Sequence, residues 1–184
     1  MKQQSTRRKR ILRRIPMLDR NSHGFSLVEL LVVIAIVGII AGFSTPALLS
    51  MKAKSSLRAD ARDVYSTFRY AQGEAVKRSV SVCIIFNDPS TGEYKVFLDN
   101  GAGTKANNAV QDTGEGTLSV NRLRSGSSFA GINFKDAALN PVNPGFNARG
   151  LPLGGKIGSV EIHSSALKMK LSLSVAGNIK STVL

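Results

Sequence analysis

The stretch Gly24-Phe25-Ser26-Leu27-Val28-Glu29-Leu30 opens a long apolar run and decides the fold of the chain. No charged residue follows from Leu30 to Met51, a span of 22 residues. At about 1.5 Å of helix per residue, this span can cross a hydrocarbon layer of about 30 Å. Glu29 stands at the edge of the run, where an ionised carboxylate costs about 2.5–3.5 kcal/mol unless it is paired. The stretch therefore predicts a membrane-inserted helix whose acid needs a partner.

The basic residues of the chain are concentrated before this run. Of the formal charge of +13, +7 lies in residues 1–24 and +6 in residues 25–184. Lysine and arginine on the cytoplasmic flank of a membrane helix set its orientation, so most of the charge is a topology signal and needs no nucleic acid to explain it. Met17 is an alternative start, which would leave a leader of eight residues.

Two ordinary readings compete for the apolar run. One is a plain signal-anchor helix that stays uncut. The other is a cleavable secretory signal with a cut near Ala41 or Ala47. A glutamate at the head of the apolar region is unfavourable in such a signal.

The motif from Gly24 to Glu29, with the apolar run behind it, resembles the processing site of type IV pilins and type II secretion pseudopilins. In that superfamily a prepilin peptidase cuts after the glycine and methylates the new first residue. The resemblance implies cleavage after Gly24, N-methylation of Phe25, and an assembly role for Glu29 at the fifth mature position. Pro46 falls at the twenty-second, where the family often kinks its helix.

The resemblance also implies a domain organisation and a location. Residues 1–24 are a cleaved basic leader, residues 25–51 the transmembrane and assembly half of the helix, and residues 52–184 a periplasmic pilin-like domain that includes the second half of the helix. The chain is expected in the inner membrane as a single-pass protein and then in a filament. Its expected partners are other pilin or pseudopilin subunits, contacted through the N-terminal helix, and the prepilin peptidase.

The helix is predicted to continue to Lys77-Arg78, whose positive charges suit a helix C-terminus. Apolar residues recur there every three or four positions, which indicates a core-facing stripe. The stripe consists of Leu57, Ala61, Val64, Phe68, Ala71 and Ala75. The charged residues off this stripe are expected on solvated faces; they are Arg58, Asp60, Arg62, Asp63, Arg69 and Glu74.

After Val80 the apolar period changes from 3.6 to 2, which predicts strands. The predicted strands are 80–87, 94–98, 118–123, 128–134, 168–175 and 179–183. Residues 101–116 are expected to form a mobile loop, and residues 141–155 an irregular segment rich in proline and glycine.

A long N-terminal helix packed on antiparallel sheets is an α+β, pilin-like fold. The order of elements resembles the H-type minor pseudopilins, the GspH/FimT family. Two later segments carry this weaker part of the resemblance: 146–152 and 175–180.

The sequence contains no pattern of a catalytic or metal site, so we predict a protein that is not an enzyme and holds no cofactor or metal. His23 and His163 are single and distant from one another. Asp99 and Asp112 lack the dense oxygen spacing of a calcium loop and are expected to be solvated. The lone Cys83 cannot form an internal disulfide and is expected to be a buried thiol. Its lack of a partner favours a minor subunit, because major pilins commonly close a loop with two cysteines.

Three functions remain open. The first is a minor pseudopilin of a type II secretion pseudopilus. The second is a minor type IV pilin that binds DNA for uptake; its candidate residues are Lys156, Lys168, Lys170 and Lys180, with Arg122, Arg124 and Arg149 elsewhere. Few aromatic residues accompany these lysines, and lysine lacks the bidentate fork of arginine, which favours a solvated face. The third is a membrane-anchored periplasmic domain without a filament.

Overall fold

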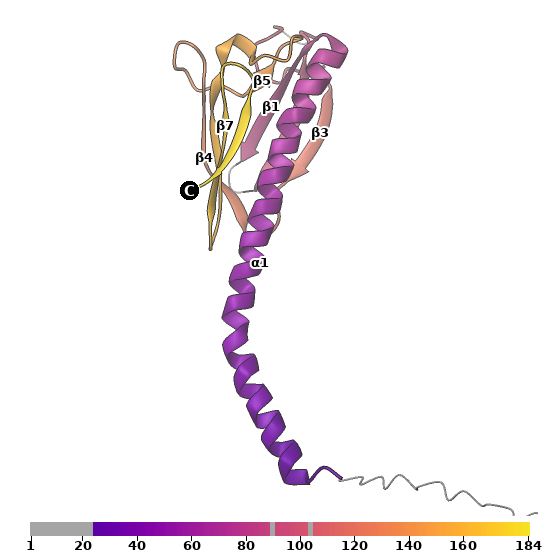
Figure 1. Cartoon of the computed structure of the whole chain (residues 1–184). Helices are drawn as coiled ribbons and strands as arrows, with labels where there is room; N and C mark the ends of the chain where they lie inside the picture. Colours follow the sequence, from indigo (N-terminus) through magenta and orange to yellow (C-terminus); the bar gives the residue numbers. More distant parts are fainter. Residues whose placement is uncertain (1–23, 89–90, 103–104) are drawn as a thin grey trace, which may run out of the picture. The chain divides into compact units, whose positions relative to one another are not determined.

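The computed structural model describes residues 24–88, 91–102 and 105–184, and these residues fold into one long helix and eight strands. The leader, with Met17 and His23, lies outside the described residues. The chain divides into two units, residues 1–42 and 43–184, and all strands belong to the second. The predicted α+β fold, a long helix followed by antiparallel sheets, is confirmed (Figure 1).

Helix α1 covers Leu27–Arg78. The Leu30 amide donates to the Ser26 carbonyl over 3.1 Å, at the start of the helix. The helix ends at Arg78, as predicted, and Ser79 follows in the left-handed conformation (φ 56°) that often terminates helices. Pro46 lies inside α1; the kink at this position stays a prediction.

Two four-stranded antiparallel sheets form the rest of the second unit. The first has the order β3-β2-β1-β5 and consists of β1 (Ser81–Asp88), β2 (Glu93–Asp99), β3 (Thr117–Arg122) and β5 (Gly145–Phe146). The second has the order β4-β6-β7-β8 and consists of β4 (Ser127–Lys135), β6 (Ile157–Ser164), β7 (Lys168–Leu173) and β8 (Ile179–Val183). A 3-10 turn, η1 (Leu153–Gly155), precedes β6. All six predicted strands are present: the strand at 179–183 has the predicted ends, and no end of the other five is shifted by more than two residues.

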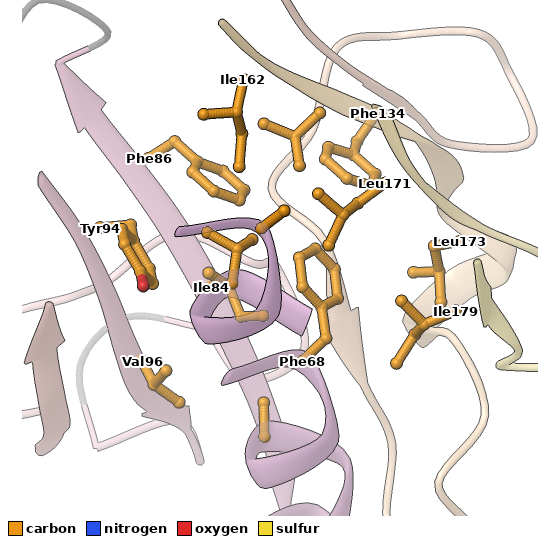
Figure 2. Close-up of a cluster of buried hydrophobic side chains, with 14 of the residues drawn as sticks. Phe68, Ile84, Phe86, Tyr94, Val96, Phe134, Ile162, Leu171, Leu173 and Ile179 are labelled. Carbon is orange, nitrogen blue, oxygen red and sulfur yellow. The ribbon is translucent and has the colours of Figure 1, made fainter. Parts of the chain in front are cut away.

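The core lies between α1 and the two sheets (Figure 2). The predicted stripe of α1 is buried throughout, from Leu57 to Ala75, with exposures of 0–1%. Phe68 is central to it: its ring lies 5.9 Å from that of Phe134 on β4 and 6.4 Å from those of Phe86 on β1 and Phe146 on β5. One helical side chain therefore joins both sheets to α1.

Strand β6 was missed by the sequence analysis, although it lies inside the second sheet between β4 and β7. Its buried residues Val160 and Ile162 alternate with partly exposed Glu161 and His163, but Gly158 interrupts the start of the strand. A Cβ atom on Gly158 would lie 1.9 Å from the Asn133 carbonyl oxygen, and its φ is +152°. Only glycine lets β4 and β6 approach so closely here.

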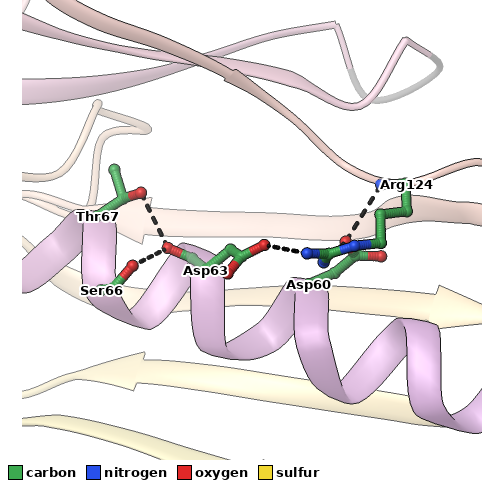
Figure 3. A network of polar contacts seen from close by, with 5 residues as sticks. All are labelled: Asp60, Asp63, Ser66, Thr67 and Arg124. Carbon is green, nitrogen blue, oxygen red and sulfur yellow. Dashed lines mark hydrogen bonds and ion pairs between the residues drawn. The ribbon is translucent and has the colours of Figure 1, made fainter.

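Asp60 was expected on a solvated face and is instead 1% exposed. Its Oδ1 accepts the Arg124 backbone N–H over 3.1 Å and the Arg124 guanidinium Nη1 over 2.8 Å (Figure 3). The same guanidinium binds the more exposed Asp63 over 2.8 Å. The prediction was wrong because helical spacing shows which face a residue occupies, but does not show that a loop 64 residues away covers that face.

Glu74 was also expected to be solvated and is buried, with 9% of the residue exposed. Its carboxylate binds Arg78 and Lys77, one turn further along α1. The hydrogen bond from Arg78, together with the positive charges of both partners, lowers the pKa of Glu74. These contacts explain how a carboxylate is accommodated at the edge of the core.

We expect Asp60→Ala to lower the free energy of unfolding by about 2 kcal/mol, because the Arg124 amide loses its acceptor and the guanidinium loses its buried partner. The matched change Asp63→Ala, at a carboxylate with 55% side-chain exposure, should cost less than about 1 kcal/mol. Urea unfolding of the full chain in detergent, followed by circular dichroism, measures both. Equal losses would show that burial of Asp60 does not matter.

Candidate functional site

The first unit of the structure presents an apolar surface that the described residues of this unit do not cover. Every large hydrophobic side chain from Phe25 to Ile40 is at least 48% exposed, whereas the core residues of the second unit are 0–9% exposed. Monomeric soluble proteins rarely expose a contiguous apolar surface of this extent, and such surfaces mark contact with lipid or with another protein. This apolar segment is the candidate functional site.

Glu29 is the one charged residue between Gly24 and Met51. It lies in the first turn of α1 and its side chain is exposed. A carboxylate at this end of a helix is favoured by the unpaired backbone N–H groups there. That interaction does not neutralise the carboxylate, so an apolar environment would still require a cation beside it.

Three glycines in and beside this segment have room for a side chain among the described residues. A Cβ atom on Gly24, Gly38 or Gly42 would meet no atom within 4 Å, and none of the three has a left-handed φ. A larger residue at position 24 would therefore fit the structure. The contacts among the described residues thus give no structural reason for a glycine at this position.

No single helix of the described residues is long and apolar enough to cross a membrane, but the two stretches Leu27–Phe43 and Pro46–Arg78, taken together, meet that test by length and composition.

The four candidate DNA-binding lysines do not form one surface. Lys168, Lys170 and Lys180 lie on the outer face of the second sheet, because Lys168 and Lys170 alternate with the buried residues of β7 and Lys180 pairs with Ser172 on the same face. Lys170 binds Glu161 on β6 over 3.3 Å. Lys156 is only 6% exposed and follows η1, so its expected place on a solvated or DNA-binding face was wrong.

Acidic residues also hold the connection from β2 to β3, and the expected exposure of one of them, Asp99 at the end of β2, was wrong. Asp99 is 1% exposed and its two oxygens accept the backbone N–H groups of Asn107 and Ala109 over 2.6 and 2.7 Å. The Asp112 carboxylate accepts the Lys105 amide, and the buried Glu115 accepts the Gly101 and Asp112 amides. The carboxylates thus organise the loop, and the described residues contain no group of three or more ligands suited to a metal ion.

Cys83 and His163 have structural surroundings. The Cys83 thiol is buried, as predicted, and lies 3.7 Å from Oδ2 of Asp99. Burial, together with the negative charge of Asp99, raises the pKa of this thiol, so it stays protonated and unreactive. His163 on β6 shares a hydrogen bond of 3.1 Å with the Ser128 hydroxyl on β4.

Comparison with protein families gives two matches. The prokaryotic N-terminal methylation motif matches residues 19–45, which include Gly24, Phe25 and Glu29. The family of the type II transport protein GspH matches residues 60–177, more than half of the chain. The chain therefore belongs to the GspH family of pilin-like proteins, as its order of elements indicated. Subunits of this class are structural, and the chain is not an enzyme.

Two solved structures are similar to the chain. The minor pseudopilin EpsH from the type 2 secretion system of Vibrio cholerae is 10% identical; the match covers 70% of this chain and 97% of that one, with a TM-score of 0.50. The type IV minor pilin FimU of Pseudomonas aeruginosa is 17% identical, covers 70% and 90% of the two chains, and has a TM-score of 0.49. At such identity the likeness to EpsH supports the fold alone. No curated protein matches the chain.

Proposed function

We propose that this chain is a minor pseudopilin, a structural subunit of the pseudopilus of a type II secretion system. The observation that carries the proposal is the uncovered apolar segment of α1, with one acid in its first turn and a structurally unneeded glycine before it. The description of its family as a type II transport protein supports a secretion pseudopilus over a type IV pilus. The unpaired Cys83 supports a minor subunit.

In this proposal a prepilin peptidase removes residues 1–24 and methylates the amino group of Phe25. Residues 25–51 hold the subunit in the inner membrane as a single pass before assembly, and residues 52–184 form the periplasmic domain. The same apolar segment then leaves lipid and packs against other subunits in the fibre. Both environments bury the exposed side chains from Phe25 to Ile40, which supports one segment serving both states.

Glu29 has a specific role in this scheme. Cleavage creates an ammonium group at Phe25, four residues or about 6 Å along the helix from Glu29. In the fibre, the Glu29 carboxylate of one subunit pairs with the ammonium of its neighbour. Removal of either charge leaves the other unpaired in an apolar environment, so the pair selects the subunit register.

The cleavage site is tested by Gly24→Val, which the fold accommodates because no atom lies within 4 Å of the added Cβ. We expect this variant to keep its leader, while the matched change Gly38→Ala, at another open glycine, is processed normally. Mass spectrometry of the membrane-extracted protein distinguishes the two. Normal cleavage of Gly24→Val, or a wild-type protein cut elsewhere, would rule the site out.

The charge pair is tested by Glu29→Gln, which keeps the size of the side chain and removes its charge. The variant should be cleaved normally, but its amount in sheared fibres should fall about a hundredfold or more, because an unpaired charge in an apolar site costs about 3–5 kcal/mol. Leu30→Ala, the adjacent position, is the control and should still assemble. Full incorporation of Glu29→Gln would reject the pairing.

A DNA-binding minor pilin is the second candidate, favoured by the common face of Lys168, Lys170 and Lys180. The ion pair of Lys170 with Glu161 weakens it. We expect replacement of these three lysines by glutamine to change duplex retardation in a gel no more than replacement of Lys52, Lys77 and Lys105. A selective loss, with a lower salt dependence, would support DNA capture.

A further inference from the structure

Four basic residues form a stripe on the exposed side of α1 within the second unit, and we call it the basic stripe: Lys54, Arg58, Arg62 and Arg69. At about 100° per residue, these residues and Tyr65 fall within an arc of about 80°. All four cations are exposed. No acidic side chain among the described residues lies within ion-pair distance of any of them.

The acids of this part of α1 lie on the other flank of the helix and are already engaged. Asp60 and Asp63 bind Arg124 from the β3–β4 connection, and Glu74 binds Lys77 and Arg78. Like charges four residues apart, as at positions 54, 58 and 62, repel one another and destabilise a helix. The basic stripe therefore destabilises α1 in the isolated chain, and an acidic group from outside the chain would remove this repulsion.

The stripe borders a groove of about 290 Å³ between α1 and the second sheet. Arg58, Ala61, Arg62 and Tyr65 line it from the helix, Met169 from β7 and Ser181 from β8. Figure 1 shows β7 and β3 on opposite sides of α1, so this groove lies away from the Asp60–Arg124 contact. Further along α1, the Arg69 guanidinium lies 5.5 Å from the centre of the Tyr65 ring. Arg69 also donates a hydrogen bond to the Tyr65 hydroxyl, which holds the ring in place.

We propose that the basic stripe and its groove are the docking surface for an acidic face of a different protein subunit. Arginine, tyrosine and methionine are the residue types enriched at protein interfaces, and here all three line one groove. A nucleic acid would gain from the arginines but not from the apolar floor formed by Ala61 and Met169. The inference rests on the proposed function, because it names a partner class for a subunit of a fibre.

A second copy of this chain does not fit the surface. Residues 25–184 carry a formal charge of +6, so two copies repel one another. Apart from Glu29 and Asp88, the acidic residues of the described ranges are engaged within the chain. Examples are Glu93 with Lys95, Glu161 with Lys170, and Asp136 with the amides of its own turn. We therefore expect the complementary charge on another polypeptide.

The test uses the full chain in cells that contain the complete set of fibre subunits. The variant R58E/R62E should lose about tenfold or more of the subunits that co-purify from detergent-extracted membranes, because like charges across an interface cost several kcal/mol. The control R122E/R149E makes the same change of charge at two exposed arginines elsewhere and should keep its partners. R58Q/R62Q, which removes charge without reversing it, should give an intermediate loss and covers the case in which R58E/R62E does not fold.

A photo-crosslinking residue at position 62 identifies the partner, with position 120, an exposed residue of β3, as its control. We expect position 62, and not 120, to cross-link an acidic segment of a different subunit. Cross-linking to a second copy or to nucleic acid, or normal co-purification of both charge variants, would overturn the inference. Cleavage after Gly24 and fibre incorporation of the wild type are measured in the same cells: if these succeed while the charge variants behave normally, the docking surface fails and the proposed function stands.

Discussion

The structure depends on a single requirement, that the apolar stripe of α1 from Leu57 to Ala75 be covered by two sheets at once. Neither sheet can bury that stripe alone, since Phe68 contacts rings from β1 and β5 of one sheet and from β4 of the other. Non-local packing of this kind stabilises the helix far more than its intrinsic propensity does. The charged residues on either side of the stripe are arranged around this contact, acids toward β3 and cations toward β7.

Much of the fold could be predicted from local patterns. The stripe of α1 and the alternation in β7 are periodic, and basic residues mark the end of α1 at Arg78. All three signals can be recognised without knowledge of the rest of the chain. Burial of polar groups could not be predicted in this way. Asp60 and Lys156 have residue types that are usually exposed, and only the path of distant segments covers them. Asp99 and Glu115 are buried for the same reason, because the groups that donate hydrogen bonds to their carboxylates are backbone amides with no sequence signature.

The candidate functional site, in contrast, could be predicted mostly from the sequence. The large apolar side chains of the segment around Glu29 are exposed in the described structure, so composition and spacing describe this segment almost completely. The basic stripe is intermediate. The spacing of its residues is visible in the sequence. Only the structure shows that Asp60 and Asp63 are already paired with Arg124 and therefore do not pair with the stripe. Charge on a helix is informative about partners once the internal pairs are known.

The glycine at the start of β6 has a consequence for how this protein can vary. Position 158 admits no side chain, since the Asn133 carbonyl occupies the space that a Cβ would need. The residue that hides β6 from pattern recognition is thus the one that permits the strand to join its neighbour. Among relatives of this chain, we expect drift in the apolar residues of β6 to be tolerated, while a mutation of this glycine to alanine would divide the second sheet and be removed by selection.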